Sequence, residues 1–133
     1  RAMRDHVINR GRGFIFSTAP SPLMAACVRE ALRIVEEEPD RREALHDLIG
    51  YAARKLAPFG VSASGSQIIP LVLGDEARTM HIAGALRSAG FDIRGIRPPT
   101  VPAGSSRLRI SLTLNIGRPQ IDALADTLSE ILA

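Results

Sequence analysis

The chain has 133 residues, of which 45% are hydrophobic and 23% are charged. A chain of this length can bury one hydrophobic core of ordinary size. Its formal net charge of +3 comes from 17 cations and 14 anions, a balance that argues against an obligatory nucleic-acid partner. No apolar run approaches the roughly 20 residues needed to cross a bilayer, and no secretory leader is recognisable. We therefore expect a cytoplasmic protein that does not contact membranes.

The first forty residues predict two helices, separated by a loop and a short apolar run. Residues 1–9 are typical of the end of a helix, and residues 10–13 predict a loop. The apolar run 14–16 has strand propensity. From Ser21 onward, apolar residues recur at the i, i+3, i+4 spacing of a helix, namely Met24, Cys27, Val28, Ala31, Leu32 and Val35. The only cysteine, Cys27, lies on this apolar stripe, so we expect a buried small side chain rather than a nucleophile.

A second helix is predicted to follow Pro39. Asp40 and Glu43 have the spacing of a capping box, and the helix should stop at residues 58–60. Its apolar stripe consists of Leu45, Leu48, Ile49, Ala52 and Leu56. We expect this helix to form an antiparallel pair with the one before it. The single lysine, Lys55, lies beside Arg54 in a helical pattern and is interpreted as an ordinary surface residue.

The remainder of the chain alternates strand and helix signals. After a Ser/Gly-rich turn at residues 62–66, a strand is predicted over 67–73, where Pro70 indicates an edge position or a bulge. Asp75 can cap the next helix, which Gly90 ends. The remaining predicted elements are strands at 91–96 and 107–114 and a final helix that begins near Pro119 and buries Ile121, Leu124, Leu128 and Leu132.

This order predicts an α/β (α+β) fold with a mostly antiparallel sheet, helices on one face and an open opposite face. The strand 107–114 alternates strictly, which places Leu108, Ile110, Leu112 and Leu114 toward the core and Arg107, Arg109, Ser111 and Thr113 on the open face. An arginine fork suits a planar carboxylate better than a lysine does. A solvated sheet face without a ligand is the alternative interpretation.

Residues 96–112, read as IRPPTVPAGSSRLRISL, resemble the C-terminal signature of the α-oxoamine synthases. Members of that family condense an amino acid with an acyl-CoA or acyl carrier and release carbon dioxide. The resemblance implies that Arg109 grips the substrate carboxylate, that Arg107 supports it and that Thr100 lies near the substrate. Residues 13–23, GFIFSTAPSPL, also match, which implies that Thr18, or else Ser17, contacts the cofactor phosphate of the partner subunit.

The resemblance further implies a pyridoxal-phosphate cofactor, a homodimer and the small C-terminal domain of a fold-type I transferase. The Schiff-base lysine would lie upstream of Arg1, so no catalytic residue is expected in this chain, and the chain alone should be inactive. Residues 1–18 would end the large cofactor domain, residues 19–60 would be connecting helices, and residues 61–133 would form the small domain.

Two other classes of function stay open. A free-standing, non-catalytic ligand-binding or interaction domain could have the same order of elements, and it would be stable and monomeric alone. A nucleic-acid role is less well supported, because no aromatic platform accompanies the arginines. A metal site is not expected, because the three histidines are isolated from other ligand-type residues: His6, His46 and His81.

Overall fold

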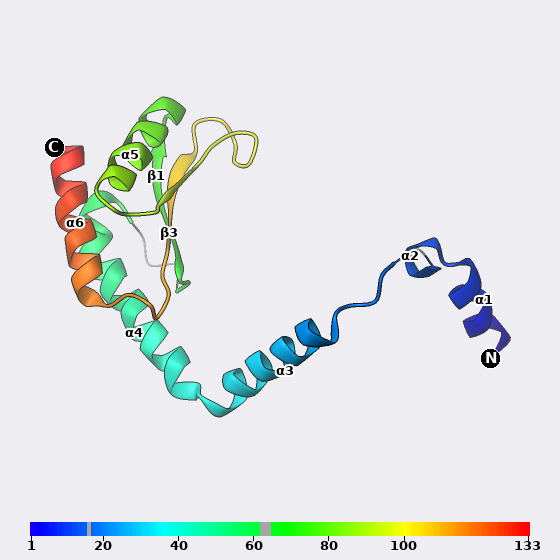
Figure 1. The fold of residues 1–133 in the computed structure, drawn as a ribbon. Coiled ribbons are helices and arrows are strands. Elements are labelled where there is room, and N and C mark those ends of the chain that lie inside the picture. The colour runs from blue at the N-terminus through cyan, green and yellow to red at the C-terminus, as the bar shows by residue number, and fades with distance from the viewer. Residues whose placement is uncertain (16, 62–64) are drawn as a thin grey trace. The chain divides into compact units, whose positions relative to one another are not determined.

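The computed structural model describes residues 1–15, 17–61 and 65–133. The chain divides into two units, residues 1–38 and residues 39–133. Figure 1 shows the elements of both units, coloured along the chain. Each unit is described by itself below.

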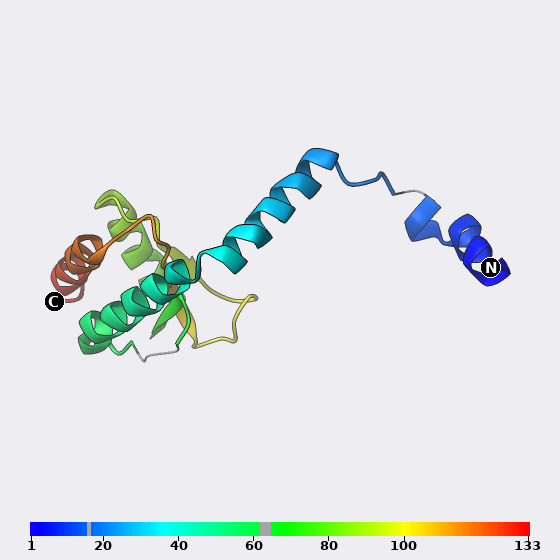
Figure 2. The same ribbon diagram turned by 90° about the horizontal axis from the view of Figure 1, so that it is seen from below.

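The described part of the first unit forms three helices, which can be followed in Figure 2: α1 (Ala2–Arg10), α2 (Arg12–Ile15) and α3 (Pro22–Glu37). The helix expected at 1–9 is confirmed. The predicted loop at 10–13 is confirmed only at Gly11, which separates α1 from α2. The strand expected at 14–16 is wrong where it is described, because residues 12–15 are helical; Phe16 lies outside the described residues. A strand needs a neighbour for its backbone hydrogen bonds, and the described part of this unit contains no strand.

Helix α3 begins as predicted, with Ser21 before it and Pro22 in its first turn. Arg33 forms ion pairs with Glu30 and Glu37, one turn away on either side. The apolar stripe of this helix is exposed, at Leu23, Met24, Val28, Leu32 and Val35. Cys27 is exposed as well, so the expectation of a buried thiol is wrong. The helical periodicity of this segment was predicted correctly. Its apolar residues are nevertheless not buried, because neither α1 nor α3 buries any of its residues.

The second unit follows the predicted order. After α4 (Pro39–Leu56) and a short 3-10 turn η1 (Ala57–Phe59), it contains β1 (Ile68–Gly74), α5 (Glu76–Ser88), β2 (Arg94–Ile96), β3 (Ser106–Ser111) and α6 (Arg118–Leu132). Asp75 caps α5 as expected, because its carboxylate accepts a 2.7 Å hydrogen bond from the Arg78 amide. At the start of α4, Asp40 lies inside the first turn rather than at the cap.

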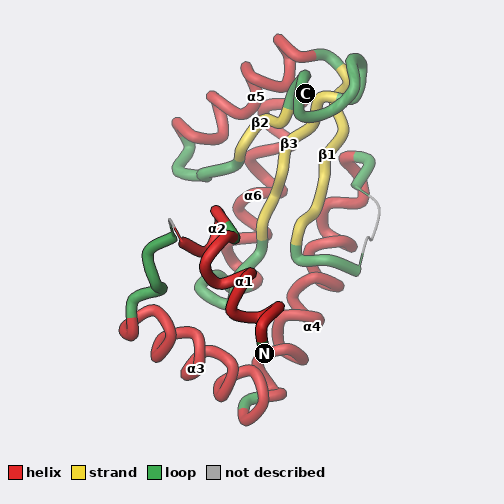
Figure 3. The backbone as a smooth tube through the Cα atoms, turned by 90° about the vertical axis from the view of Figure 1, so that its right-hand side faces the viewer, coloured by secondary structure: helices red, strands yellow, loops and turns green. Residues whose placement is uncertain are grey.

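The three strands form an antiparallel sheet in the order β1-β3-β2, as Figure 3 shows. Strand β1 is therefore an edge strand, and it also has an irregularity between Val72 and Gly74. Both features agree with the presence of Pro70. Strand β3 ends at Ser111, earlier than the sequence predicted. Leu114 is therefore exposed instead of joining the core.

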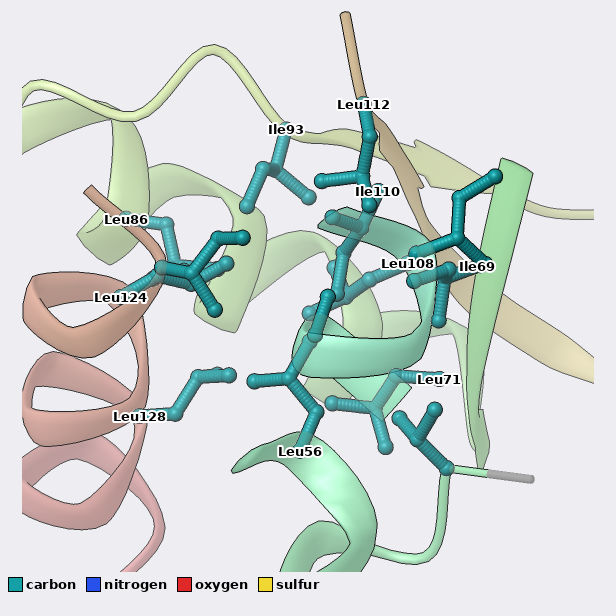
Figure 4. Close-up of a cluster of buried hydrophobic side chains, with 14 of the residues drawn as sticks. Leu56, Ile69, Leu71, Leu86, Ile93, Leu108, Ile110, Leu112, Leu124 and Leu128 are labelled. Atoms are coloured by element: carbon teal, nitrogen blue, oxygen red, sulfur yellow. The ribbon is translucent and has the colours of Figure 1, made fainter. Parts of the chain in front are cut away.

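The core lies between one face of the sheet and helices α4, α5 and α6, part of which Figure 4 shows. Strand β3 contributes Leu108 and Ile110, and Leu112 follows directly after the strand; all three are at most 3% exposed, as the alternation predicts for one face. The helices contribute Leu48, Ile49, Ala52, Leu56, Ile82, Ala83, Leu86, Ile121, Leu124 and Leu128. The opposite sheet face carries the alternate residues of β3, among them both arginines.

A polar cluster joins α4 to α6. The Tyr51 hydroxyl donates a 2.6 Å hydrogen bond to Asp122 Oδ1, and Lys55 Nζ lies 2.9 Å from the same oxygen. The Arg118 guanidinium lies over the Tyr51 ring, 4.9 Å from its centre. The hydrogen bond from Tyr51, followed by that from Lys55, holds the pKa of the Asp122 carboxyl below its ordinary value. Lys55 is thus a surface residue, as expected, but it is ion-paired.

Acidification is expected to weaken this link between α4 and α6. A carboxyl whose folded-state pKa is lowered adds stability above its unfolded pKa, near 3.9, and that stability is lost as the pH falls through the folded value. Asp122→Asn should therefore lower the urea midpoint of the full chain at pH 7 and make a smaller difference at pH 3. The exposed Asp47→Asn is the control; an Asp122 effect that does not change with pH would contradict the prediction.

Candidate functional site: an arginine pocket on the open sheet face

A shallow pocket of about 350 Å³ lies on the sheet face opposite the core. Its apolar lining comes from β1 and β2, and its polar groups come from β3, from the turn that precedes β3 and from Ser66 before β1. The lining residues are Ser66, Ile68, Pro70, Ile96, Thr100, Arg107 and Arg109. All three residues that the sequence predicted for substrate binding therefore lie together around one pocket.

Strand register explains how the arginines reach this pocket. Arg109 lies opposite Pro70 of β1, and Arg107 lies opposite Ile96 of β2. Residues directly opposite each other in paired strands project from the same face of a sheet. Because Leu108 lies between the two arginines and points into the core, Arg107 and Arg109 must point the other way.

The two guanidinium groups have different surroundings. Arg107 is half-buried, and its Nε donates a 2.9 Å hydrogen bond to the Ser105 carbonyl, which fixes the side chain beside the turn. Arg109 is exposed, and no hydrogen bond or ion pair with any described residue engages it. Arg109 is consequently the group that can offer its whole fork to an incoming carboxylate, while Arg107 adds positive charge at a fixed position.

The turn that carries Thr100 is held by local contacts. The Thr100 amide donates a 3.0 Å hydrogen bond to the Arg97 carbonyl, and the Ser105 hydroxyl donates a 2.7 Å bond to the Pro102 carbonyl. Arg97 forms an ion pair with Glu76, in the first turn of α5. Thr100 is exposed. Its hydroxyl is therefore presented at the pocket by an ordered turn.

The two residues expected to contact a cofactor phosphate, Ser17 and Thr18, belong to the first unit. The Ser17 hydroxyl donates a hydrogen bond to the Gly13 carbonyl, so its proton is already engaged. Thr18 is exposed, and its hydroxyl can donate to an anion. Of the two candidates, Thr18 is therefore better suited to bind a phosphate.

Other chemistry is sparse in the described residues. They include no group of three or more histidine, cysteine or acidic side chains that could hold a metal ion. None of the helices in this part of the chain is long and apolar enough to span a membrane. The pocket can bind and orient an anion, but its lining supplies no general acid or base.

Comparisons with known proteins place these features in a family. Residues 1–128 match the model of the family described as aminotransferase class I and II. The chain belongs to this family. It is 42% identical over 134 aligned positions to the 8-amino-7-oxononanoate synthase of Anaeromyxobacter dehalogenans (strain 2CP-C), an alignment that covers 99% of this chain and 34% of that enzyme. The chain thus spans about a third of the length of this relative.

Solved structures of two other enzymes have the same fold. A structure of 8-amino-7-oxononanoate synthase from Francisella tularensis matches with a TM-score of 0.76 and 21% identity, covering 99% of this chain and 39% of that one. A serine palmitoyltransferase from S. paucimobilis with a bound pyridoxal-phosphate–myriocin aldimine matches with a TM-score of 0.81 and 22% identity, covering 98% and 34%. The expected fold class, a domain of a fold-type I pyridoxal-phosphate transferase, is confirmed.

Pyridoxal phosphate is the cofactor of the family to which this chain belongs, and it is bound in the matched serine palmitoyltransferase structure. The residues of this chain fit contacts to the periphery of pyridoxal phosphate rather than its covalent attachment. The sole lysine, Lys55, is held by Asp122 on the helical side of the second unit, whereas the arginine pocket lies on the opposite face of the sheet. Lys55 therefore does not suit Schiff-base formation beside this pocket, and Thr18 remains the candidate contact to the phosphate.

Proposed function

We propose that this chain is part of a pyridoxal-phosphate-dependent acyltransferase of the 8-amino-7-oxononanoate synthase type. Such an enzyme joins L-alanine to pimeloyl-CoA, or to a pimeloyl carrier protein, in biotin biosynthesis. In this proposal the chain supplies the clamp for the amino-acid carboxylate. The observation that carries it is the Arg109 fork, which no described residue engages, in a pocket that also contains Arg107 and Thr100.

Each pocket residue has a distinct part in the proposed clamp. Arg109 binds the carboxylate through two parallel hydrogen bonds, and Arg107, fixed by the Ser105 carbonyl, adds positive charge beside it. Thr100 offers a hydroxyl from the turn. A bound pyridoxal phosphate would supply the electron sink for the bond changes at the amino acid. Holding the carboxylate orients the amino acid for that chemistry, which is a positioning effect.

The rest of the proposed enzyme lies outside this chain. The cofactor lysine would come from the remaining part of the parent protein, and Thr18 would contact the cofactor phosphate across a homodimer interface. Residues 1–18 would close the large domain, residues 19–60 would connect the domains, and residues 61–133 would form the small domain. The length of the chain relative to its relatives supports this division of roles.

The test is to assemble this chain with the remaining two-thirds of its parent enzyme and to measure carbon dioxide release. Activity with L-alanine and pimeloyl-CoA that requires both pieces is the expected result. Turnover of glycine with acetyl-CoA or succinyl-CoA would instead indicate a glycine C-acetyltransferase or a 5-aminolevulinate synthase. A monodisperse monomer of 133 residues that binds amino acids without cofactor would favour a free-standing ligand-binding domain.

A further inference from the structure

A third arginine lies on the open face beside the pocket. Arg94 of β2 is directly opposite Arg109 of β3 in the antiparallel register. Gly95, the next residue, faces α5 so closely that a Cβ there would lie 2.9 Å from Met80 Sδ. Since neighbouring strand residues point to opposite faces, Arg94 must project from the same face as Arg109. The sequence pattern had not singled out Arg94, because its place depends on the strand register.

Two cations directly opposite each other in a sheet repel and destabilise the pair unless an anion compensates them. The compensating anion here is Asp92. Its Oδ1 lies 3.0 Å from Arg94 Nε, and its Oδ2 lies 3.2 Å from Arg94 Nη2, so the carboxylate grips the guanidinium fork with both oxygens. Arg94 thus already holds a carboxylate, while Arg109, its neighbour across the strands, holds none among the described residues.

We propose that Arg94 is a second carboxylate-binding position and that Asp92 is the internal group that occupies it in the absence of ligand. The site would then take a small dicarboxylate, with one carboxylate on Arg109 and the other on Arg94 in place of Asp92. Both arginines are exposed, so neither carboxylate has to be buried in order to bind. This inference rests on the proposed function only for the role of Arg109.

The test compares succinate with butyrate, which has the same number of carbons and one carboxylate fewer. Their dissociation constants for the full chain are measured by calorimetry at constant ionic strength. Succinate should bind about 2- to 5-fold more tightly than butyrate, as expected for one additional exposed ion pair. Arg94→Gln should remove this advantage and leave butyrate binding nearly unchanged. Asp92→Asn should enlarge the advantage, because the internal competitor has lost its charge.

Asp47→Asn serves as the control for an acidic residue lost elsewhere on the surface. Equal tightening of succinate and butyrate binding by Asp92→Asn would indicate only a general charge effect and would overturn the proposal. So would a succinate advantage that survives Arg94→Gln. If succinate binding is lost in Arg94→Gln but unchanged in Arg109→Gln, the role proposed for Arg109 falls and the second position stands. If neither anion binds, both proposals fall.

Discussion

Arg109→Gln is expected to raise the KM for the amino-acid substrate about 10- to 150-fold in the assembled enzyme. That range corresponds to the roughly 1.5–3 kcal/mol of a hydrogen bond to a charged group. Glutamine keeps a polar side chain of moderate length but loses the charge and the fork that would hold the carboxylate. Arg109 is exposed and has no partner among the described residues, so its loss should leave the fold intact. Steady-state kinetics and thermal melting of the same samples check the two statements.

Arg87→Gln is the matched control, because Arg87 is an exposed arginine at the end of α5 and does not line the pocket. Arg109→Lys should give an intermediate KM, since it restores the charge without the fork. An unchanged KM in Arg109→Gln, or an equal rise in Arg87→Gln, would remove the support for a carboxylate clamp at this position.

Leu108→Ala is expected to destabilise the chain by about 2–5 kcal/mol. Leu108 is fully buried in the core and lies in the middle of the central strand. It stands between Arg107 and Arg109 in the sequence. Truncation removes its buried methyl groups and leaves a cavity that strands paired on both sides of β3 cannot easily close. Because Arg107 and Arg109 flank this residue, the same change should also disturb the pocket. Urea unfolding of the full chain, followed by circular dichroism, measures the loss.

Val72→Ala is the comparison for a strand residue that does not enter the core. Val72 is 54% exposed on edge strand β1, directly opposite Arg107. Its truncation should change stability by about 0.5 kcal/mol or less, as is usual for surface substitutions. Similar losses for Leu108→Ala and Val72→Ala would mean that the face assignment of the sheet is wrong.

Local signals predicted most of the second unit correctly. The alternation around Leu108 and the cap at Asp75 gave the strand face and the helix start, because both depend on residues close together in sequence. The end of β3 was less predictable, since Leu114 continues the alternating pattern although the ladder stops at Ser111. Strand length depends on the partner strand, and the last pair of residues described at this end of the β1–β3 ladder is Ile68 with Ser111.

Contacts between distant residues were beyond the sequence pattern. No residue near Lys55 in the sequence predicted its ion pair with Asp122, which lies on another helix. Arg94 gained its significance only from the register that sets it opposite Arg109. The site residues Arg107, Arg109 and Thr100 were accessible from the sequence because the short segment that carries all three resembles a family signature. Their roles in substrate binding, and that of Thr18 toward the cofactor, stay predictions.

Pro70 makes the outer edge of strand β1 a poor partner for a strand from another molecule. Leu112 donates its amide hydrogen bond to the Gln67 carbonyl, and alternate pairs in an antiparallel ladder share this inward orientation. Pro70, paired with Arg109, falls on the other set, whose backbone nitrogens face away from β3. The missing amide hydrogen of proline therefore costs the ladder nothing and removes a donor from the outer rim of β1. A foreign strand cannot complete its hydrogen bonds there, which discourages edge-to-edge self-association of this sheet.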